Sequence, residues 1–135
     1  MKIREIMTRE VKTVGPQEDA RSVYQKLTGL GVHHVPVVDA GKVVGILSTT
    51  DYRGLVHGAG KGGKITTDMV FGGLSVGALM TKDPLTLPPD ATVTSAASVM
   101  LKHGIHAVPV VEDGALQGIL TSNDILSAVS KGTLA

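Results

Sequence analysis

The sequence predicts an α+β fold in which one β-α-β-β-α unit occurs twice in tandem and the two copies pack with pseudo-twofold symmetry. The first observation is an internal repeat, since residues 6–56 align with residues 79–129 without a gap. Internal repetition determines the architecture of a chain before any local signal does. Two copies are too few for a solenoid, so we expect each repeat to bury its apolar face against the other.

The second observation is that identical residues concentrate in two blocks of each repeat. The segment 31–38 (GVHHVPVV) matches 104–111 (GIHAVPVV), and 45–51 (GILSTTD) matches 118–124 (GILTSND). Identity concentrated in the same two segments indicates that both repeats use them for the same purpose. Any site formed by one repeat therefore has an equivalent in the other.

Each repeat is expected to open with a short strand followed by a helix. The strands are predicted at residues 11–14 and 85–87, and prolines mark their ends, Pro16 in the first copy and Pro88-Pro89 in the second. Apolar residues then recur at helical spacing over residues 20–30 and 93–103. Gly31 and its equivalent in the second repeat stand where a left-handed residue ends a helix.

Two continuous apolar runs predict the next two strands of each repeat, at residues 35–38 and 43–47 in the first copy. Continuous rather than alternating apolar residues indicate strands that are covered on both faces. Pro36 and Pro109 have no N–H group to donate to a sheet, so we expect an edge or a bulge at these positions.

The predicted organisation is one module over residues 1–135, with repeats at 1–57 and 78–131 and a glycine-rich connector at 58–77. Within the connector, Gly58 to Lys64 (GAGKGGK) has the spacing of a phosphate-binding loop. Such a loop needs Ser or Thr next to hold magnesium, and it must follow a strand. Ile65 stands there instead, and a predicted helix precedes it. Nucleotide hydrolysis by this loop is therefore the least favoured alternative.

Composition excludes several classes of protein. With a formal net charge of +1 and 2% aromatic residues, the chain lacks the basic face and the stacking platform that nucleic-acid binding uses. The absence of cysteine excludes disulfides, thiolate metal ligands and cysteine nucleophiles, and it fits an intracellular protein. No apolar run is long enough to span a bilayer, and the charged start lacks the apolar region of a signal peptide. We expect a cytoplasmic protein that binds neither nucleic acid nor membrane.

The Ser/Thr-x-x-Asp sequence in each repeat, Ser48 with Asp51 and Thr121 with Asp124, fits two roles. Read structurally, it is a capping box that starts the last helix of the repeat. Read functionally, the helix N-terminus offers N–H groups and a positive dipole to an anion, and a carboxylate in the first turn can accept both hydroxyls of a ribose. The two roles are compatible, and together they suit a ribonucleotide.

Two tandem copies of His-x-Val-Pro-Val-Val followed by Gly-h-h-[Ser/Thr]-x-x-Asp, where h is apolar, resemble CBS domains, named after cystathionine β-synthase. A tandem pair is called a Bateman module. The resemblance covers nearly the whole chain except the connector. It implies a stand-alone, non-catalytic regulatory module that binds adenosine ligands (AMP, ADP, ATP or S-adenosylmethionine) in clefts between the repeats. It also implies a homodimer, an unidentified regulated protein as partner and no further cofactor.

The resemblance further implies two composite clefts, each taking a hydroxyl and an aspartate from one repeat and its adenine contacts from the other. The residues carried over to the first cleft are Ile46, Ser48, Thr50, Asp51, Leu85, Thr86, Ile105, His106 and Ala107. Those carried over to the second cleft are Ile119, Thr121, Asn123, Asp124, Lys12, Thr13, Val32, His33 and His34. The family often places Arg or His just before Val-Pro to meet phosphate. Because His34 stands at that position opposite Ala107, we expect the cleft with Asp124 to bind phosphate better.

Other interpretations of these residues stay open at this point. A metal site at His103 with His106, or at the adjacent pair His33 and His34, lacks a carboxylate or cysteine at ligand spacing. A purely structural histidine near a strand start fits as well as a phosphate contact. No nucleophile elbow or catalytic triad is present, so we expect no enzyme. The remaining rival is a structural dimerisation module with vestigial clefts.

Overall fold

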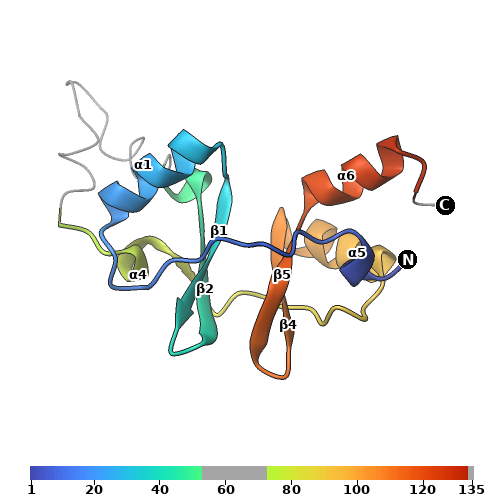
Figure 1. Ribbon diagram of the computed structural model, residues 1–135, viewed down its shortest axis with the longest axis horizontal. Coiled ribbons are helices and arrows are strands. Elements are labelled where there is room, and N and C mark those ends of the chain that lie inside the picture. The colour runs from blue at the N-terminus through green and yellow to red at the C-terminus, as the bar shows by residue number, and fades with distance from the viewer. Residues whose placement is uncertain (53–72, 134–135) are drawn as a thin grey trace. The chain divides into compact units, whose positions relative to one another are not determined.

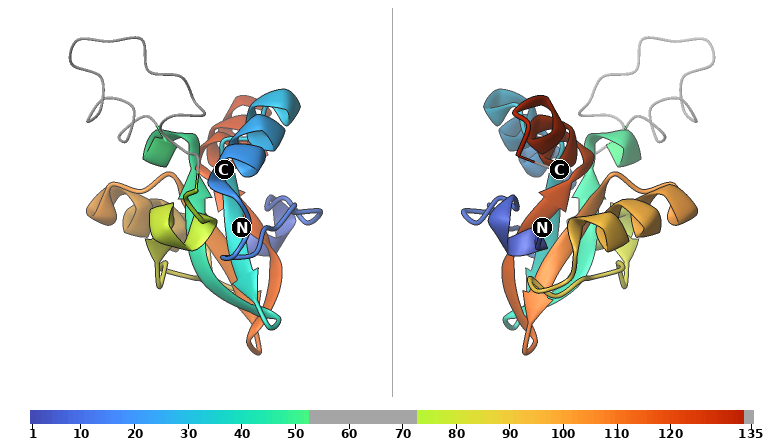
Figure 2. Two further views of the ribbon diagram at one scale, coloured as in Figure 1. Left: turned by 90° about the vertical axis from the view of Figure 1, so that its left-hand side faces the viewer. Right: turned by 90° about the vertical axis from the view of Figure 1, so that its right-hand side faces the viewer.

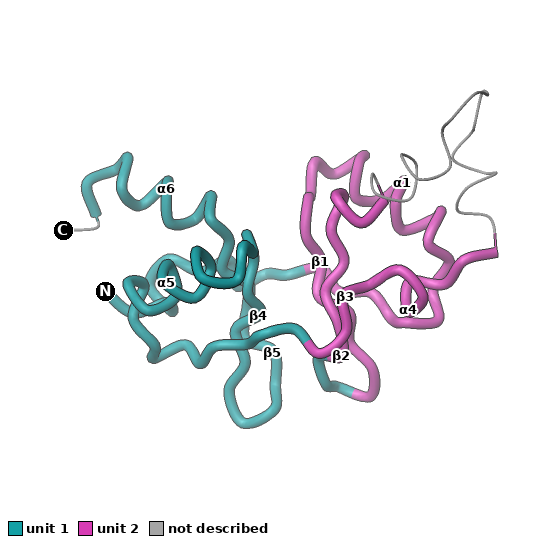
Figure 3. The backbone as a smooth tube through the Cα atoms, turned by 180° about the vertical axis from the view of Figure 1, so that it is seen from behind, with its two compact units in different colours: residues 1–11, 41–43, 84–135 teal, residues 12–40, 44–83 magenta. Residues whose placement is uncertain are grey.

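The computed structural model describes residues 1–52 and 73–133, so the Gly58–Lys64 motif lies outside the described residues. The chain divides into two compact units, coloured separately in Figure 3. Unit 1 comprises residues 1–11, 41–43 and 84–135, and unit 2 comprises residues 12–40 and 44–83. The elements in chain order are η1 (Ile3–Glu5), α1 (Ala20–Leu30), β1 (His34–Asp39), β2 (Lys42–Ser48), α4 (Val76–Leu79), β3 (Thr81–Lys82), α5 (Val93–His103), β4 (Ala107–Glu112), β5 (Ala115–Thr121) and α6 (Ser122–Ser130).

Unit 2 combines helix α1 with a three-stranded sheet of order β1-β2-β3. Helix α1 begins after Asp19, whose carboxylate accepts a hydrogen bond from the Ser22 amide, and ends at Gly31, whose φ of 67° is left-handed as expected. In Figure 1 the helix lies beside β1, with α4 below it. The core that joins them consists of Ala20, Val23, Leu27, Val35, Val37, Leu47, Tyr52 and Val76.

Unit 1 combines the antiparallel β4–β5 hairpin with η1, α5 and α6. The two views of Figure 2 show η1 and α5 on opposite sides of this hairpin. The strand β4 has an irregular register between Val110 and Val111, one residue after Pro109, close to where the proline predicted an edge or a bulge. The core of the unit consists of Ile3, Met7, Ala96, Met100, Val108, Val110 and Leu120. Both units therefore have the α+β composition that the sequence predicts.

The short strands predicted at 11–14 and 85–87 are reduced to one parallel bridge each, Val14 with Val37 and Leu87 with Val110. Val14 donates to the carbonyl of Pro36 at 3.2 Å and accepts from Val38 at 2.8 Å. Lengthening this ladder in one direction requires an N–H group from Pro36, and in the other direction one from Pro16. Neither proline has one. The second repeat stops its ladder for the same reason, so the strand prediction was too long in both copies.

The leading segment of each repeat, near residues 3–7 in the first and near Val76 in the second, packs into the unit of the other repeat. Ile3 and Met7 lie in the core of unit 1, together with the second repeat, and the amide of Ile3 donates to the carbonyl of Ala91 at 2.9 Å. Equivalently, Val76 lies in the core of unit 2, and its amide donates to the carbonyl of Glu18 at 2.9 Å. The two leading segments are therefore exchanged between the repeats, a feature that the sequence analysis did not predict.

Candidate ligand-binding site

The Thr-x-x-Asp sequence of the second repeat forms the N-terminal cap of α6. The amide of Thr121 donates to Asp124 Oδ2 at 2.9 Å, and the amide of Asp124 donates to Thr121 Oγ1 at 3.2 Å. The Thr121 hydroxyl also donates to Asp124 Oδ2, at 3.1 Å. The capping box expected from the sequence is therefore confirmed. Both bonds from Thr121 to the carboxylate fall on the same oxygen, so Oδ1 is not used by the cap.

The Ser-x-x-Asp sequence of the first repeat makes the same two bonds to its carboxylate. Ser48 donates to Asp51 Oδ2 twice, from its amide at 2.8 Å and from its hydroxyl at 3.2 Å. Residues 49–52 are helical from this point on. The two carboxylates are thus presented alike, each half-buried and each with its Oδ1 outside the cap.

The first backbone amide of each of these helices donates a hydrogen bond to a histidine carbonyl. The amide of Ser122 donates to the carbonyl of His106 at 2.9 Å, and the amide of Thr49 donates to the carbonyl of His33 at 3.0 Å. Together with the Asp124 amide, two of the first three N–H groups of α6 are therefore already bonded within the protein. The sequence predicts that these N–H groups bind an anion. In the structure fewer of them remain available for an anion, and the backbones of His33 and His106 are held beside the caps.

The side chains of these histidines lie in different surroundings. His33 and His106 are exposed, whereas His34, the first residue of β1, is half-buried. Its equivalent Ala107 is 6% exposed and pairs with Thr121 across the β4–β5 hairpin. His34 and Ala107, which differ between the two repeats, are thus the first residues of the strands β1 and β4 and lie next to the caps.

The predicted site residues are distributed over both units. Unit 1 contains the predicted residues of the second repeat, which are Leu85, Thr86, Ile105, His106, Ala107, Ile119, Thr121, Asn123 and Asp124. Unit 2 contains those of the first repeat, which are Lys12, Thr13, Val32, His33, His34, Ile46, Ser48, Thr50 and Asp51. Each predicted composite cleft needs residues of both units. The structure joins Ala107 to Thr121 across the β4–β5 hairpin and the His106 carbonyl to the start of α6, and the assembly of either cleft stays a prediction.

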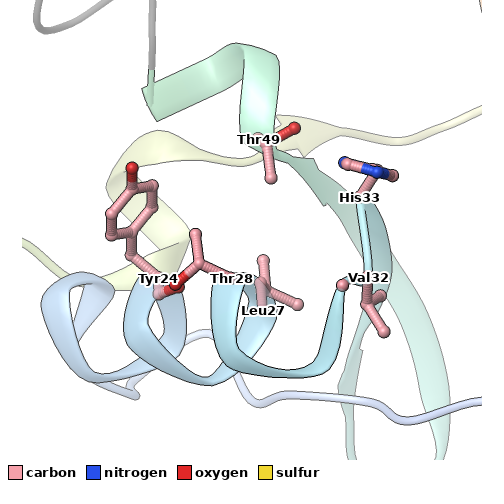
Figure 4. Close-up of a pocket in the computed structure, with 7 residues that line it drawn as sticks. Tyr24, Leu27, Thr28, Val32, His33 and Thr49 are labelled. Atoms are coloured by element: carbon pink, nitrogen blue, oxygen red, sulfur yellow. The ribbon is translucent and has the colours of Figure 1, made fainter.

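Each unit also carries an open cavity next to these residues. In unit 1 a cavity of about 320 Å³ is lined by Asp124 together with residues of η1, of α6 and of the turn after it. In unit 2 a smaller one of about 210 Å³ lies between the C-terminal half of α1, the segment Gly31–His33 and Thr49. Figure 4 shows Leu27, Thr28 and Val32 on one side of the latter, and His33 and Thr49 at its other end. Predicted site residues therefore border open space in both units.

Sequence reasoning missed one residue at the Asp124 carboxylate, which is Thr8. Its hydroxyl lies 3.4 Å from Asp124 Oδ1, although the two residues are far apart in the sequence. The signal was present, because Met7-Thr8 and Met80-Thr81 are identical and equivalent in the two repeats. It did not point to the site, because only the contacts of the folded chain show that the leading segment of the first repeat reaches the cap of the second.

Among residues 1–52 and 73–133, no three His, Cys, Asp or Glu side chains come together as metal ligands. The carboxylates of Asp51 and Asp124 are instead paired with backbone and hydroxyl groups, and the side chains of His33 and His106 are exposed. What this arrangement can do chemically is to accept hydrogen bonds from a ligand at the open carboxylate oxygens.

Comparison with protein-family models matches the CBS domain to residues 3–58 and again to residues 76–131. The chain belongs to the CBS domain family. The resemblance inferred from the motifs is confirmed, and with it the α+β fold of two tandem CBS repeats. The matched ranges reach back to residues 3 and 76, and so include the leading segments that are exchanged between the two units.

Similar proteins include enzymes that are much longer than this chain. It is 31% identical over 118 residues to an inosine-5′-monophosphate dehydrogenase from Korarchaeum cryptofilum, a match that covers 87% of this chain and 22% of that protein. It is 30% identical to the uncharacterized protein MJ0188 of Methanocaldococcus jannaschii over 98% of this chain and 46% of that protein. The chain thus spans less than half the length of these curated relatives.

Similar solved structures match nearly end to end. The structure of CBSX2 in complex with AMP is 27% identical, with a TM-score of 0.81 over 98% of each chain. The CBS domain pair of protein MJ0100 in complex with 5′-methylthioadenosine and S-adenosyl-L-methionine is also 27% identical, with a TM-score of 0.80 over 98% of each chain. CBS pairs similar to this chain therefore bind adenosine compounds.

Within the part of the chain that the structure describes, none of the helices has the length and apolar character needed to cross a membrane.

Proposed function

We propose that this CBS pair is a non-catalytic regulatory module that senses an adenosine ligand, AMP, ADP, ATP or S-adenosylmethionine, in clefts formed by both repeats. The observation that carries the proposal is the duplicated carboxylate of Asp51 and Asp124. In each, the helix cap uses one oxygen and the other is left outside the cap. A carboxylate that is fixed by a cap and keeps an open acceptor is suited to a ribose hydroxyl.

The complexes formed by similar CBS pairs support this choice of ligand class. These complexes contain AMP in one case and 5′-methylthioadenosine with S-adenosyl-L-methionine in the other. All three compounds share adenine and ribose and differ at the 5′ position. The shared part is what a pair of ribose-binding carboxylates would recognise, so we expect the ribose contact at Asp124 for any of them.

The test is calorimetric titration of the protein with AMP, ATP and S-adenosylmethionine. Wild type is expected to bind at least one of them, and Asp124→Ala to weaken binding by about 1.5–3 kcal/mol, the range for a hydrogen bond to a charged group. The matched control is Glu112→Ala, because Glu112 is an exposed acid at the hairpin turn, the opposite end of β4 from the pair Ala107–Thr121. If no adenosine compound binds wild type, the sensing function is wrong and the dimerisation alternative takes its place.

We further propose that the module acts as a homodimer and transmits the ligand signal to a regulated protein. Large apolar side chains stay exposed on α5 and α6, with Leu101 85%, Leu126 64% and Val129 57% exposed. A ligand changes the response of such an assembly only through its different affinity for two states. Light scattering should give twice the chain mass for wild type. A single-chain mass at the concentrations used for titration would contradict the dimer.

A cytoplasmic location stays a prediction of the sequence.

A further inference from the structure

The hydroxyl of Thr8 lies beside the one oxygen of the Asp124 carboxylate that the cap leaves open. Asp124 Oδ2 accepts both bonds from Thr121, and Oδ1 lies 3.4 Å from Thr8 Oγ1. This distance is long for a bond between a hydroxyl and an oxygen, which is strongest near 2.7–2.8 Å. The contact is therefore weak and saturates neither group. Both the carboxylate oxygen and the Thr8 hydroxyl keep capacity for a ligand.

The backbone of the protein fixes the position of Thr8. The amide of Thr8 donates to the carbonyl of Ile119 at 2.9 Å, and the amide of Ile119 donates back to the carbonyl of Thr8 at 3.0 Å. Gly118 permits this approach, because a Cβ atom there would lie 2.5 Å from the Thr8 carbonyl oxygen. The neighbouring Met7 is 9% exposed and belongs to the core of the unit. The exposed Thr8 hydroxyl is thus held in place next to Asp124.

We propose that Thr8 is a ribose-specificity residue of the site at Asp124. One hydroxyl of the ribose cis-diol donates to Asp124 Oδ1, and the other is bound by Thr8 Oγ1. Because Oδ2 is committed to the cap, the carboxylate alone offers the diol only one open oxygen. Thr8 supplies the missing second partner at a separation that the two hydroxyls of one diol can reach. The inference rests on the proposed function and names the residue that completes ribose recognition.

The first repeat does not reproduce this contact. Thr81 is the equivalent of Thr8, and it pairs with Ile46 as Thr8 pairs with Ile119. Among the described residues, however, no hydrogen bond joins Thr81 to Asp51, whose Oδ2 is bonded only to Ser48. Ribose selectivity should therefore be stronger at the site with Asp124, and Thr81 provides a matched control.

The experiment compares the binding of AMP, 2′-deoxy-AMP and 3′-deoxy-AMP by calorimetry in wild type, Thr8→Val, Thr8→Ser and Thr81→Val. Valine has the shape of threonine and lacks the hydroxyl. Thr8→Val should weaken AMP binding by about two- to tenfold, the worth of one neutral hydrogen bond. It should also remove the preference of the protein for AMP over one of the two deoxy compounds. Thr8→Ser should keep this preference, and Thr81→Val should leave the Asp124-dependent binding unchanged.

Loss of AMP affinity with an unchanged preference for AMP over both deoxy compounds would mean that Thr8 has only a structural role, and it would overturn the inference. The inference also fails if Thr8→Val binds all three nucleotides like wild type while Asp124→Asn has lost AMP; the proposed function then stands. If wild type does not bind AMP, the ribose contact at Thr8 is excluded as well.

Discussion

Asp51 and Asp124 show at the level of single residues how a capping role leaves one oxygen of the same side chain for the proposed ligand contact. The sequence left capping and binding open as roles for these aspartates. The structure assigns one carboxylate oxygen to the cap and leaves the other outside it. The two roles can therefore be separated by a substitution that keeps one acceptor and removes the other.

Asparagine at position 124 should separate these roles, since its single carbonyl oxygen can still accept the bond from the Thr121 amide. We expect Asp124→Ala to lower the free energy of unfolding by about 1 kcal/mol through loss of the cap, and Asp124→Asn to lower it by much less. Urea denaturation of the three proteins measures this. Equal stability of Asp124→Ala and wild type would show that the cap contributes nothing.

Tyr52 is a buried residue with a polar role in the core. It is 1% exposed, and its hydroxyl donates to the carbonyl of Ala20 at 2.8 Å. Burial, together with the nearby carboxylate of Asp51, raises the pKa of Tyr52 above its ordinary value. Tyr52→Phe removes this hydrogen bond and leaves the carbonyl without it, so the variant should lose about 1 kcal/mol of stability at neutral pH.

The raised pKa of Tyr52 also fixes the sign of a pH dependence. In the unfolded chain Tyr52 ionises near pH 10, whereas in the folded protein it stays neutral to higher pH. The stabilising contribution of Tyr52 is therefore complete below about pH 10 and is lost as the pH rises further. Denaturation of wild type and Tyr52→Phe between neutral and strongly alkaline pH should show the two stabilities converging. Parallel curves would contradict the shift.

At the level of elements, the local pattern of apolar residues was sufficient to predict the longer helices and strands. Helices α1 and α5 and the strands β1 and β4 lie where helical spacing and apolar runs predicted them. The first strand of each repeat was predicted too long, because adjacent prolines on both strands remove the N–H groups that a longer ladder needs. The elements η1, α4 and β3 were not predicted, since they are short and depend on contacts with the unit they pack into.

Two equivalent glycines accept these short elements. A Cβ atom at Gly45 would lie 2.9 Å from the carbonyl oxygen of Thr81, and one at Gly118 would lie 2.5 Å from that of Thr8. Both distances are shorter than real contacts allow, so β3 and the segment after η1 can approach only a glycine. This close approach explains why a glycine begins the Gly-Ile-Leu sequence in both repeats.

Gly118→Ala should therefore push the segment at Thr8 away and destabilise the protein by about 1–3 kcal/mol, the usual cost of overpacking. Gly29→Ala is the matched control, because Gly29 lies within α1 and a Cβ atom there meets nothing within 4 Å. That variant should gain up to about 1 kcal/mol from helix propensity. Thermal unfolding of both variants tests this. Equal stability of Gly118→Ala and wild type would show that no close approach exists.

For the whole molecule, the repeats in the sequence do not coincide with the compact units of the structure. Repetition predicted two α+β halves, and this is confirmed. The alignment could not show that the leading segment of each repeat packs into the unit of the other, because a sequence alignment contains no information on contacts. The candidate site depends on this exchange, since it brings Thr8 of the N-terminal segment to the cap at Asp124.

The exchange predicts a crossed response to two core substitutions. Ile3 and Val76 are equivalent, and both are fully buried, in unit 1 and unit 2 respectively. Each change to alanine should cost about 2–4 kcal/mol. Hydrogen exchange should then show β4, β5 and α5 losing protection in Ile3→Ala, and α1, β1 and β2 losing it in Val76→Ala. Loss confined to the repeat that directly follows each substitution in the sequence would contradict the exchange.

The central claim is that the duplicated aspartates bind the ribose of an adenosine ligand. Calorimetric titration of wild type and of the double variant Asp51→Asn/Asp124→Asn with AMP and S-adenosylmethionine tests it most directly. Asparagine keeps a cap acceptor, so the double variant should stay folded, which circular dichroism checks. Wild type is expected to bind at least one of the two compounds. The folded double variant should bind it at least about tenfold more weakly, because a hydrogen bond to a charged group contributes about 1.5–3 kcal/mol. Equal binding by both proteins, or no binding by wild type, would contradict the claim.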